Sequence, residues 1–273
     1  MRIVRSLEEM AALGHGWRGR GEGVGFVPTM GYLHAGHTSL MALARPRTRH
    51  LVASIYVNPL QFGPHEDLSR YPRDADGDAA KCADAGVDVL FMPETLYPPG
   101  FATSVSVAGV AERWEGAARP GHFQGVATVV ARLFGIVQPT LAVFGEKDFQ
   151  QLAVVRRMVE DLCLPVEVVG GPLVRDEDGL ALSSRNVYLT PEQRGRARTL
   201  SQAMAEMRAM AGATVEERLE TGRRIIDADA VDYLAIVDSR TLEPVPVLNA
   251  PARALVTARY GAVRLLDNVS VGA

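Results

Sequence analysis

Two histidines near the N-terminus are spaced so that both could contact one phosphate group. His34, Gly36 and His37 lie in the segment Val27–His37, between an apolar run and a helical pattern. Backbone N–H groups and the dipole at a helix N-terminus attract phosphate, and each imidazole can donate a hydrogen bond to charge that develops on it. The same pair could instead cap the helix or bind a metal, although no third ligand lies nearby. The segment therefore indicates a nucleotide site while leaving these alternatives open.

Lysine is rare in this chain, so the position of each lysine is informative. Of the 29 Lys and Arg residues, only Lys81 and Lys147 are lysines. Coding bias in a GC-rich genome explains the scarcity, but an ammonium and a guanidinium do different chemistry. Lys147 lies in Gly145–Gln151, between a predicted strand and a helix, where it could act as a point charge on phosphate or as a solvated loop charge. Lys81 lies in a polar helical stretch and is expected to be a surface residue.

Two other segments carry polar groups that suit small ligands. Asn58 and Gln61 follow the second predicted strand, and their amides can donate and accept without charge, although an ordinary Asn-Pro turn is equally compatible. The segment Val174–Asn186 contains Ser183-Ser184-Arg185. Two hydroxyls and a permanently charged fork can bind polyphosphate. A charged turn before the next helix is the alternative.

The elements that must position these residues alternate between short apolar runs and longer helical patterns. Strands are predicted at Val24–Pro28, Leu51–Val57, Val87–Met92, Leu141–Phe144 and Val166–Val169, and helices near His37–Ala44, Ala75–Ala85, Gly125–Val137 and Phe149–Leu162. Continuous apolar strands separated by helices favour a parallel sheet covered on both faces. We therefore expect an α/β, Rossmann-like doubly wound fold, whose ligands bind at the carboxyl ends of the strands.

The pattern changes after Gly171. Thr190, Pro191 and Gln193 predict a helix start, with Thr as the cap, and the helix should run to about residue 211. A second start at Thr214 is followed by apolar runs at Val231–Val237, Ala252–Ala258 and Val263–Leu266. We expect a boundary near residues 171–176, with the Rossmann-like domain at 1–173 and a smaller C-terminal α+β lid domain at 174–273.

Composition excludes several classes of protein. A net charge of −3 and a hydrophobic fraction of 47% indicate a foldable chain and argue against disorder and against nucleic-acid binding over a broad basic surface. Cys82 and Cys163 are too few for a disulfide framework or a zinc site, which suits a cytoplasmic protein. The N-terminus lacks the apolar region of a signal peptide. The most apolar stretch, Val126–Phe144, contains Arg, Gln and Pro, so no membrane span is expected.

The chain resembles the pantothenate synthetase (pantoate–β-alanine ligase) family, which belongs to the nucleotidyltransferases with a His-x-Gly-His motif. The blocks that carry the resemblance are Pro28–His37, Ser54–Gly63 with Tyr71–Arg73, Gly121–Val126, Gly145–Gln151 and Gly179–Asn186. They occur in family order and at family spacing. Ala35 and Leu182 depart from the longer polar residue and the Met that the family usually has at these positions.

The resemblance implies an ATP-dependent ligase. Pantoate would attack the α-phosphorus of ATP with Mg²⁺ assistance, giving pantoyl adenylate and pyrophosphate. The amine of β-alanine would then displace AMP and form pantothenate. The family also implies a homodimer, no nucleic-acid or membrane partner, and no dense cluster of protein ligands for Mg²⁺, since that ion keeps waters and phosphate oxygens.

Carried over residue by residue, the resemblance implies three groups of site residues. The catalytic group is His37, as proton donor, with His34, Lys147, Ser183, Ser184 and Arg185. The ATP-binding group comprises Met30, Gly31, Tyr32, Leu33, His34, Ala35, Gly36, His37, Gly145, Glu146, Lys147, Asp148, Val174, Leu182, Ser183, Ser184 and Arg185. Gln61, Gln151 and Asn58 would bind pantoate and β-alanine, and Tyr71, Arg119 and His122 are further members of the site.

Two other functions were weighed against the ligase. A nucleotidylyltransferase acting on a phosphorylated acceptor would share the histidine motif, but it has no use for the amides of Gln61 and Gln151. A non-catalytic nucleotide-binding protein has no need of all four of His34, His37, Lys147 and Arg185.

Overall fold

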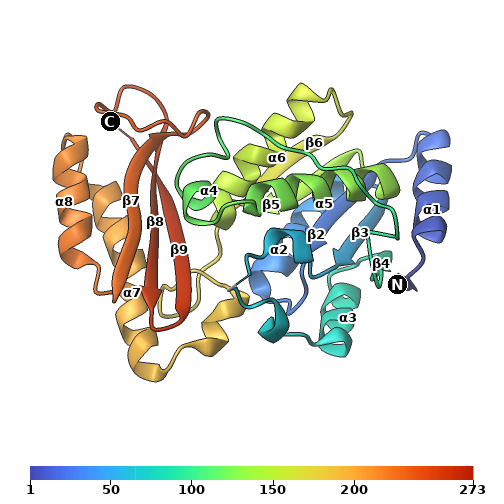
Figure 1. Cartoon of the computed structure of the whole chain (residues 1–273), viewed down its shortest axis with the longest axis horizontal. Coiled ribbons are helices and arrows are strands. Elements are labelled where there is room, and N and C mark those ends of the chain that lie inside the picture. The colour runs from blue at the N-terminus through green and yellow to red at the C-terminus, as the bar shows by residue number, and fades with distance from the viewer. Residues whose placement is uncertain (65, 273) are drawn as a thin grey trace. The chain divides into compact units, whose positions relative to one another are not determined.

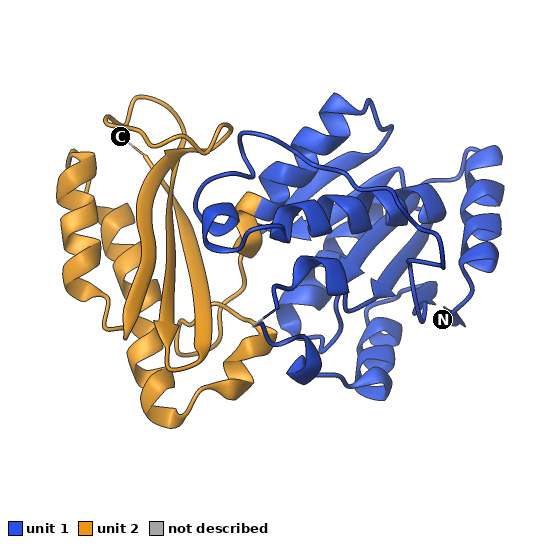
Figure 2. Cartoon of the chain, viewed as in Figure 1, with its two compact units in different colours: residues 1–146, 151–172 blue, residues 147–150, 173–273 orange. Residues whose placement is uncertain are grey.

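The structure is a computed structural model that describes residues 1–64 and 66–272. The chain divides into two compact units (Figure 2). Unit 1 comprises Met1–Glu146 and Gln151–Pro172, and unit 2 comprises Lys147–Gln150 and Leu173–Ala273. The division thus places the four residues Lys147–Gln150 with the C-terminal part of the chain, whereas the sequence predicted a contiguous N-terminal domain.

Unit 1 is built on a six-stranded parallel sheet in the order β1-β4-β3-β2-β5-β6 (Figure 1). Its strands are β1 (Arg2–Val4), β2 (Val24–Thr29), β3 (His50–Ile55), β4 (Val89–Phe91), β5 (Leu141–Gly145) and β6 (Glu167–Gly171). Its helices are α1 (Leu7–Gly19), α2 (Ala35–Ala44), α3 (Ala75–Asp84), α4 (Glu115–Ala118), α5 (His122–Val137) and α6 (Phe149–Asp161), of which the first two residues of α6 belong to unit 2. The predicted α/β class and parallel sheet are confirmed.

Apolar strands in the middle of this sheet are buried because helices pack on both faces. Leu40 and Met41 of α2 and Cys82 of α3 share a buried cluster with the strands. On α5, the ring of Phe134 contacts Phe26 of β2. The strand β1 and the helix α1, which begins at the N-cap Ser6, were not predicted from the sequence.

The topology reverses between β2 and β5, which is where ligands bind in sheets of this kind. The ladder between these two strands contains only the pairs Gly25↔Leu141 and Phe26↔Ala142. Beyond them, β2 pairs with β3 as far as Thr29, and β5 pairs with β6 as far as Gly145. The carboxyl ends of β2 and β5 are therefore not joined by a ladder. The loops that carry the histidine motif and Lys147 begin at these two ends.

Unit 2 contains an antiparallel sheet in the order β7-β8-β9 and two helices. Its elements are α7 (Pro191–Ala209), α8 (Val215–Ile225), β7 (Ala230–Asp238), β8 (Ala252–Tyr260) and β9 (Val263–Val271). The predicted cap of α7 is confirmed, because Gln193 N donates to Thr190 Oγ1 at 3.2 Å and Thr190 N donates to Gln193 Oε1 at 3.0 Å. The strand β9 runs five residues beyond the predicted end at Leu266.

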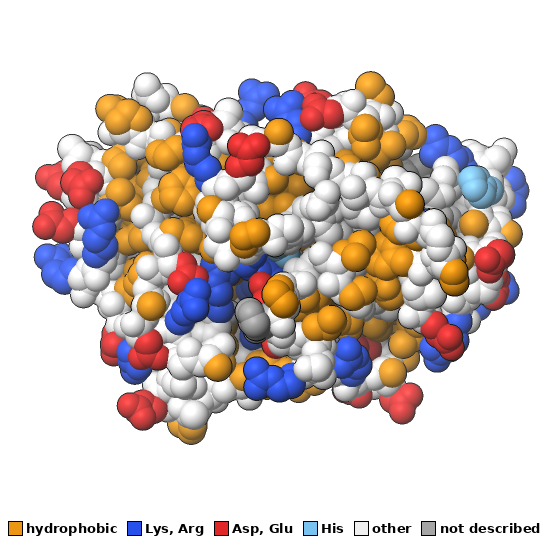
Figure 3. All heavy atoms as spheres, in the orientation of Figure 1, with side chains coloured by type: hydrophobic (Ala, Val, Ile, Leu, Met, Phe, Trp, Pro, Cys, Tyr) orange, Lys and Arg blue, Asp and Glu red, His pale blue; other side chains and the backbone are white. Residues whose placement is uncertain are grey.

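The surface carries charges of both signs. On the face drawn in Figure 3, Lys and Arg side chains alternate with Asp and Glu side chains and with hydrophobic ones. Within residues 1–64 and 66–272, no helix has the length and apolarity required to cross a membrane.

Candidate active site

The two histidines of the motif cap helix α2 and each other's backbone. His34 is the N-cap, and its Nδ1 accepts from Gly36 N at 3.1 Å. In return, Nδ1 of His37 accepts from His34 N at 3.2 Å. The result is a reciprocal capping box made of imidazoles. The capping role that the sequence left open is therefore confirmed.

Capping does not remove these histidines from phosphate chemistry. A ring whose Nδ1 accepts a hydrogen bond carries its proton on Nε2 when it is neutral. In both His34 and His37, Nε2–H is then the group that can donate to a phosphate oxygen. The two ring centroids lie 4.1 Å apart, so both donors can act on one group.

A buried carboxylate fixes the loop that leads into these histidines. Asp78 of α3 accepts from Tyr32 N at 2.7 Å and from Leu33 N at 2.6 Å, and only 1% of its surface is exposed. Tyr32 has a φ of 52° and Gly31 a φ of 85°, both in the left-handed region that costs free energy for a residue with a Cβ. Asp78 thus holds the backbone in a conformation that it would not otherwise favour.

The helix that carries Asp78 was expected to be an exposed polar stretch, and for this residue that expectation was wrong. Lys81 lies one turn away, with its Nζ 4.0 Å from both Asp78 Oδ1 and Asp74 Oδ2. Its side chain is 43% exposed, so the predicted surface position of Lys81 agrees with the structure. No pattern in the sequence distinguishes Asp78 from its exposed neighbour Asp76.

The amide of Gln61 lies next to the same loop. Its Nε2 donates to Met30 Sδ at 3.2 Å, and its Oε1 accepts from Asn58 Nδ2 at 3.0 Å. A thioether is a weak acceptor, so an oxygen of a bound substrate would compete well for the Gln61 N–H group. Gln61 can therefore bind a small acid close to the loop Met30–Leu33, which leads into the histidine pair.

Asn58 supports the amide of Gln61. Its Nδ2 also donates to Gly125 O at 3.1 Å, while its Oδ1 accepts from Leu60 N at 3.3 Å and from Tyr97 Oη at 2.8 Å. Two donors and two acceptors are all that an amide side chain has. In this arrangement Asn58 orients the Gln61 amide, and its predicted contact with the substrate stays a prediction.

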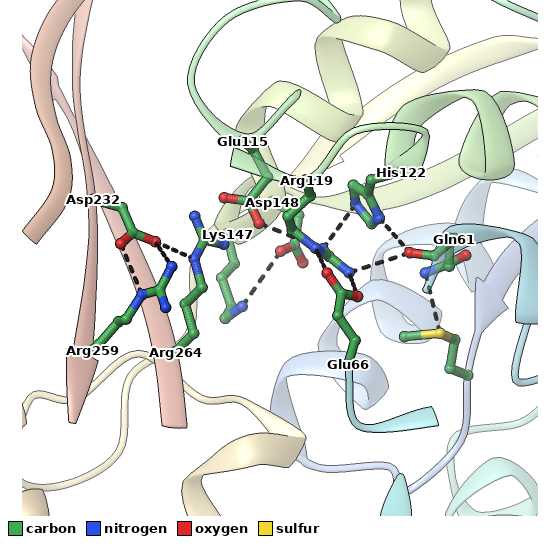
Figure 4. A network of polar contacts seen from close by, with 11 residues as sticks. Gln61, Glu66, Glu115, Arg119, His122, Lys147, Asp148, Asp232, Arg259 and Arg264 are labelled. Atoms are coloured by element: carbon green, nitrogen blue, oxygen red, sulfur yellow. Dashed lines mark hydrogen bonds and ion pairs between the residues drawn. The ribbon is translucent and has the colours of Figure 1, made fainter. Parts of the chain in front are cut away.

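Arg119 and His122 both donate hydrogen bonds to the main chain of Gln61 (Figure 4). The carbonyl oxygen of Gln61 accepts from Arg119 Nη2 at 3.2 Å and from His122 Nδ1 at 2.9 Å. Arg119 Nη1 donates to His122 Nε2 at 3.1 Å, and Glu66 accepts from Nε at 2.7 Å and from Nη2 at 2.6 Å. These residues, expected as members of the site, act on Gln61 through its main chain.

Burial and the positive charge of Arg119 determine the protonation states of His122 and Glu66. Burial, followed by the positive charge of Arg119, lowers the pKa of His122 to about 4. Burial alone would raise the pKa of Glu66, but the hydrogen bonds and charge of Arg119 outweigh it, and that pKa is lowered. His122 is therefore neutral and Glu66 ionised near neutral pH, as the hydrogen bonds require. Tyr71, the other residue expected in the site, is buried and its ring contacts that of Phe62, with centroids 5.9 Å apart.

Gly145, Glu146 and Gln151 lie in unit 1, around the end of β5 and the first turn of α6. Gln151 and Gln61 thus follow the carboxyl ends of two strands, β5 and β3, that flank β2. This is the edge of the sheet at which the predicted fold places its ligands.

Lys147 belongs to unit 2, together with Asp148. Its Nζ lies 3.4 Å from Asp148 Oδ1, and 21% of its side chain is exposed. Its carbonyl oxygen accepts from Asn268 Nδ2 at 2.8 Å. The ammonium is therefore attached to a backbone that strand β9 holds in place.

A short hairpin in unit 2 carries the remaining predicted residues. Arg175 bridges to Ala181, and Leu182 N donates to Val174 O at 3.0 Å. Ser183 follows and caps the 3₁₀ helix Ser184–Tyr188, its Oγ accepting from Arg185 N at 3.3 Å. Arg194 binds two carboxylates of the acidic turn, with Nη2 donating to Asp176 Oδ2 at 2.6 Å and Nε donating to Asp178 Oδ2 at 2.8 Å. These ion pairs stabilise the turn, and the segment Ser183-Ser184-Arg185 follows the hairpin directly.

A dedicated metal site is not formed by side chains in the described part of the chain, where no three His, Cys, Asp or Glu residues come together as ligands. The histidine pair is already engaged in capping through both Nδ1 atoms.

Known proteins match this chain over its whole length. The sequence profile of the pantoate-beta-alanine ligase family covers residues 2–270. The chain belongs to this family. Pantothenate synthetase from Thermus thermophilus is 56% identical over 280 residues, with 99% of both chains covered, and that from Rhizorhabdus wittichii is 53% identical over 278 residues with the same coverage.

Solved structures of the ligase family share the fold. A crystal structure of pantothenate synthetase from Thermus thermophilus matches with a TM-score of 0.95 and 55% identity, covering 100% of both chains. A pantoate-beta-alanine ligase from Francisella tularensis, complexed with beta-gamma ATP and beta-alanine, matches with a TM-score of 0.82 and 30% identity, covering 98% of this chain and 97% of the other. The resemblance inferred from the motifs is thereby confirmed.

Proposed function

We propose that this chain condenses (R)-pantoate with β-alanine to pantothenate through a pantoyl adenylate, using ATP as its magnesium complex. The observation that carries the proposal is the contact between Gln61 Nε2 and Met30 Sδ at 3.2 Å. It joins an uncharged amide that suits a hydroxy acid to the loop that leads into the histidine pair. A carboxylate bound there would lie next to the groups that bind phosphate.

The reaction requires activation because a carboxylate does not react with amines until it carries a leaving group. In the first step, an oxygen of pantoate attacks the α-phosphorus, and the bond to pyrophosphate breaks. We assign the Nε2–H groups of His34 and His37 to the phosphate oxygens, where they stabilise developing charge. We also assign Lys147 to the phosphates of ATP as a positive charge, and the magnesium that accompanies ATP would neutralise the remaining charge.

In the second step, the amine of β-alanine attacks the acyl carbon of the adenylate, loses its proton, and displaces AMP. Ser183, Ser184 and Arg185 are proposed to bind the pyrophosphate formed in the first step. Their hydroxyls and guanidinium could donate charge-assisted hydrogen bonds to its phosphate oxygens, and Ser183 caps the turn that carries the other two residues.

The structure favours an unphosphorylated acid over a phosphorylated acceptor. A phosphate group on the acceptor would need cationic partners beside Gln61. Arg119 is the guanidinium that contacts Gln61, but it donates two bonds to Glu66 and its side chain is only 14% exposed. The amide and thioether that remain suit a hydroxyl or a single carboxylate.

One experiment tests the proposal. The protein is incubated with ATP, magnesium and pantoate carrying ¹⁸O in its carboxylate, with and without β-alanine, and AMP and pyrophosphate are followed. We expect one ¹⁸O atom in each AMP, and full turnover only with β-alanine. Continuous AMP release without β-alanine, or a requirement for a phosphorylated acceptor, would refute the proposal. We also propose a homodimer, on the family resemblance, and sedimentation equilibrium would test it.

A further inference from the structure

Two adjacent residues of strand β9 contact both of the unit 2 segments that carry the proposed phosphate-binding groups. Asn268 binds the backbone of Lys147, and Asp267 binds Arg175 at the base of the hairpin that leads to Ser183. Both are buried, with 5% and 2% of their surfaces exposed. Polar side chains are costly to bury unless they are fully hydrogen-bonded.

The orientation of the Asn268 amide follows from its partners. Arg253 Nη1 lies 2.7 Å from Asn268 Oδ1, and a guanidinium can only donate. Oδ1 must therefore face Arg253, and Nδ2 must face the carbonyl oxygen of Lys147 at 2.8 Å. Arg253 is itself held, because it donates to Ser270 Oγ at 3.0 Å and lies 3.9 Å from the centroid of the Phe149 ring. The main chain of Lys147 and the side chain of Phe149, on either side of Asp148, thus both contact the sheet of unit 2.

Asp267 fixes the other segment in a similar way. Its two carboxylate oxygens accept from Arg175 Nη1 at 2.6 Å and from Nη2 at 2.9 Å. Arg175 Nη1 also donates to Gly179 O at 3.1 Å, which joins the two sides of the hairpin turn. One carboxylate oxygen accepts from Asn268 N at 2.7 Å, so the two residues also fix each other.

We infer that Asp267 and Asn268 are positioning residues that set the backbone of Lys147 and of the Ser183 segment relative to each other. This inference rests on the proposed function, which assigns both segments to the phosphates of ATP. Apolar side chains would fill the same buried space in β9 without requiring Arg175, Arg253 and the Lys147 carbonyl group as hydrogen-bonding partners. The positions instead carry the two side chains that can hold a carbonyl group and a guanidinium.

The scarcity of lysine gives a direct test. Reductive ¹³C-methylation labels only Lys81, Lys147 and the N-terminal amine, and it keeps their charge. Lys81→Arg and Lys147→Arg variants assign the signals, because arginine is not labelled. In the wild-type protein we expect ATP to shift the Lys147 signal. In Asn268→Ala and Asn268→Asp, which both lose the donor to Lys147 O, we expect the Lys147 signal to change and the Lys81 signal to stay.

Activity supplies the second measurement, as pantoate-dependent exchange of pyrophosphate into ATP. Loss of one buried hydrogen bond should lower kcat/KM for ATP by roughly ten- to a hundredfold in both Asn268 variants. Asn249→Ala, at an exposed asparagine of unit 2, is the matched control and should match wild type. Asp267→Asn keeps an amide oxygen that can accept from Asn268 N but loses one acceptor for Arg175. It should therefore lower exchange while leaving the Lys147 signal of the free protein unchanged, which separates the contact with Arg175 from the contact with Lys147.

The outcomes separate the inference from the proposed function. If wild-type protein shows no exchange, the proposed function fails, and the ¹³C signal of Lys147 in Asn268→Ala still reports on positioning. Wild-type kcat/KM together with an unchanged Lys147 signal in both Asn268 variants would overturn the inference. A parallel change of all three labelled amines with a lowered Tm would overturn it too, since that is the result of a general structural role.

Discussion

Replacing Asp78 tests whether the loop Met30–Leu33, which we propose to bind phosphate, depends on a residue outside it. In Asp78→Ala, the N–H groups of Tyr32 and Leu33 lose a charged acceptor at 2.7 and 2.6 Å. Hydrogen bonds to charged groups contribute about 1.5–3 kcal/mol each, so the gross loss is about 3–6 kcal/mol. Part of this is recovered when the loop opens and water hydrates both groups.

Opening is favoured because Tyr32 leaves its left-handed conformation at φ 52°. We therefore expect the loss to fall mainly on ATP binding and adenylate formation. A loss of about 3 kcal/mol corresponds to roughly a hundredfold lower kcat/KM for ATP. Global stability should fall less, because the loop can open while the sheet stays intact.

The assay is pyrophosphate exchange at varied ATP, combined with thermal unfolding. Asp78→Asn is the informative second variant, because one of its two positions becomes an N–H donor that faces a backbone N–H. Asp76→Asn, at an exposed position of the same helix, is the matched control and should behave like wild type. Values of kcat and KM within threefold of wild type in both Asp78 variants would refute the reasoning.

Three further results are expected. Lys147→Ala should lower adenylate formation by orders of magnitude in the exchange assay, since a lost charge on phosphate costs several kcal/mol. Lys81→Ala should keep near-wild-type exchange, because an exposed ion pair at 4.0 Å contributes little. Normal exchange in Lys147→Ala would contradict the role proposed for Lys147. Burial lowers the pKa of His122 to about 4, below the unfolded value of about 6.5, so the unfolded chain binds the extra proton. The stability from neutral His122 is then complete above pH 6.5 and falls by about 3 kcal/mol toward pH 4. Urea unfolding of wild type and His122→Asn should show a difference that shrinks with falling pH, and a constant difference would exclude this account. In Gly125→Ala the new Cβ would lie 2.2 Å from Leu60 O, which should cost about 1–3 kcal/mol and raise KM for pantoate more than KM for ATP; equal changes in both constants would count against it.

The sequence predicts most of unit 1 because burial on both faces leaves continuous apolar runs. The strands that form the middle of the sheet were found within a few residues of their bounds. Helix starts with reciprocal caps were found as well, at Thr190 and at Thr214, where Glu217 N donates to Thr214 Oγ1 at 3.2 Å. Local chemistry fixes these features, so local sequence is enough to predict them.

Prediction failed where the structure depends on a distant partner. The strand β1 has only three residues and pairs with β4 at the edge of the sheet, so its apolar pattern is too short to recognise. The predicted end of β9 at Leu266 was wrong because Asp267 and Asn268 interrupt the apolar run. Their side chains are polar because they bind other segments of the chain, and for this reason the predicted strand ended too early.

The same physical limit separates the residues proposed to do chemistry from those that place them. His34 and Lys147 lie in recognisable motifs because a ligand requires their side-chain types. Their anchors bind main-chain atoms, which every residue has: Asp78 binds N–H groups 45 and 46 residues away, and Asn268 binds a carbonyl group 121 residues away. A backbone partner leaves no signature in the sequence at either end of the contact. A motif can therefore indicate which groups act on phosphate, whereas only the folded chain identifies the residues that hold those groups in place.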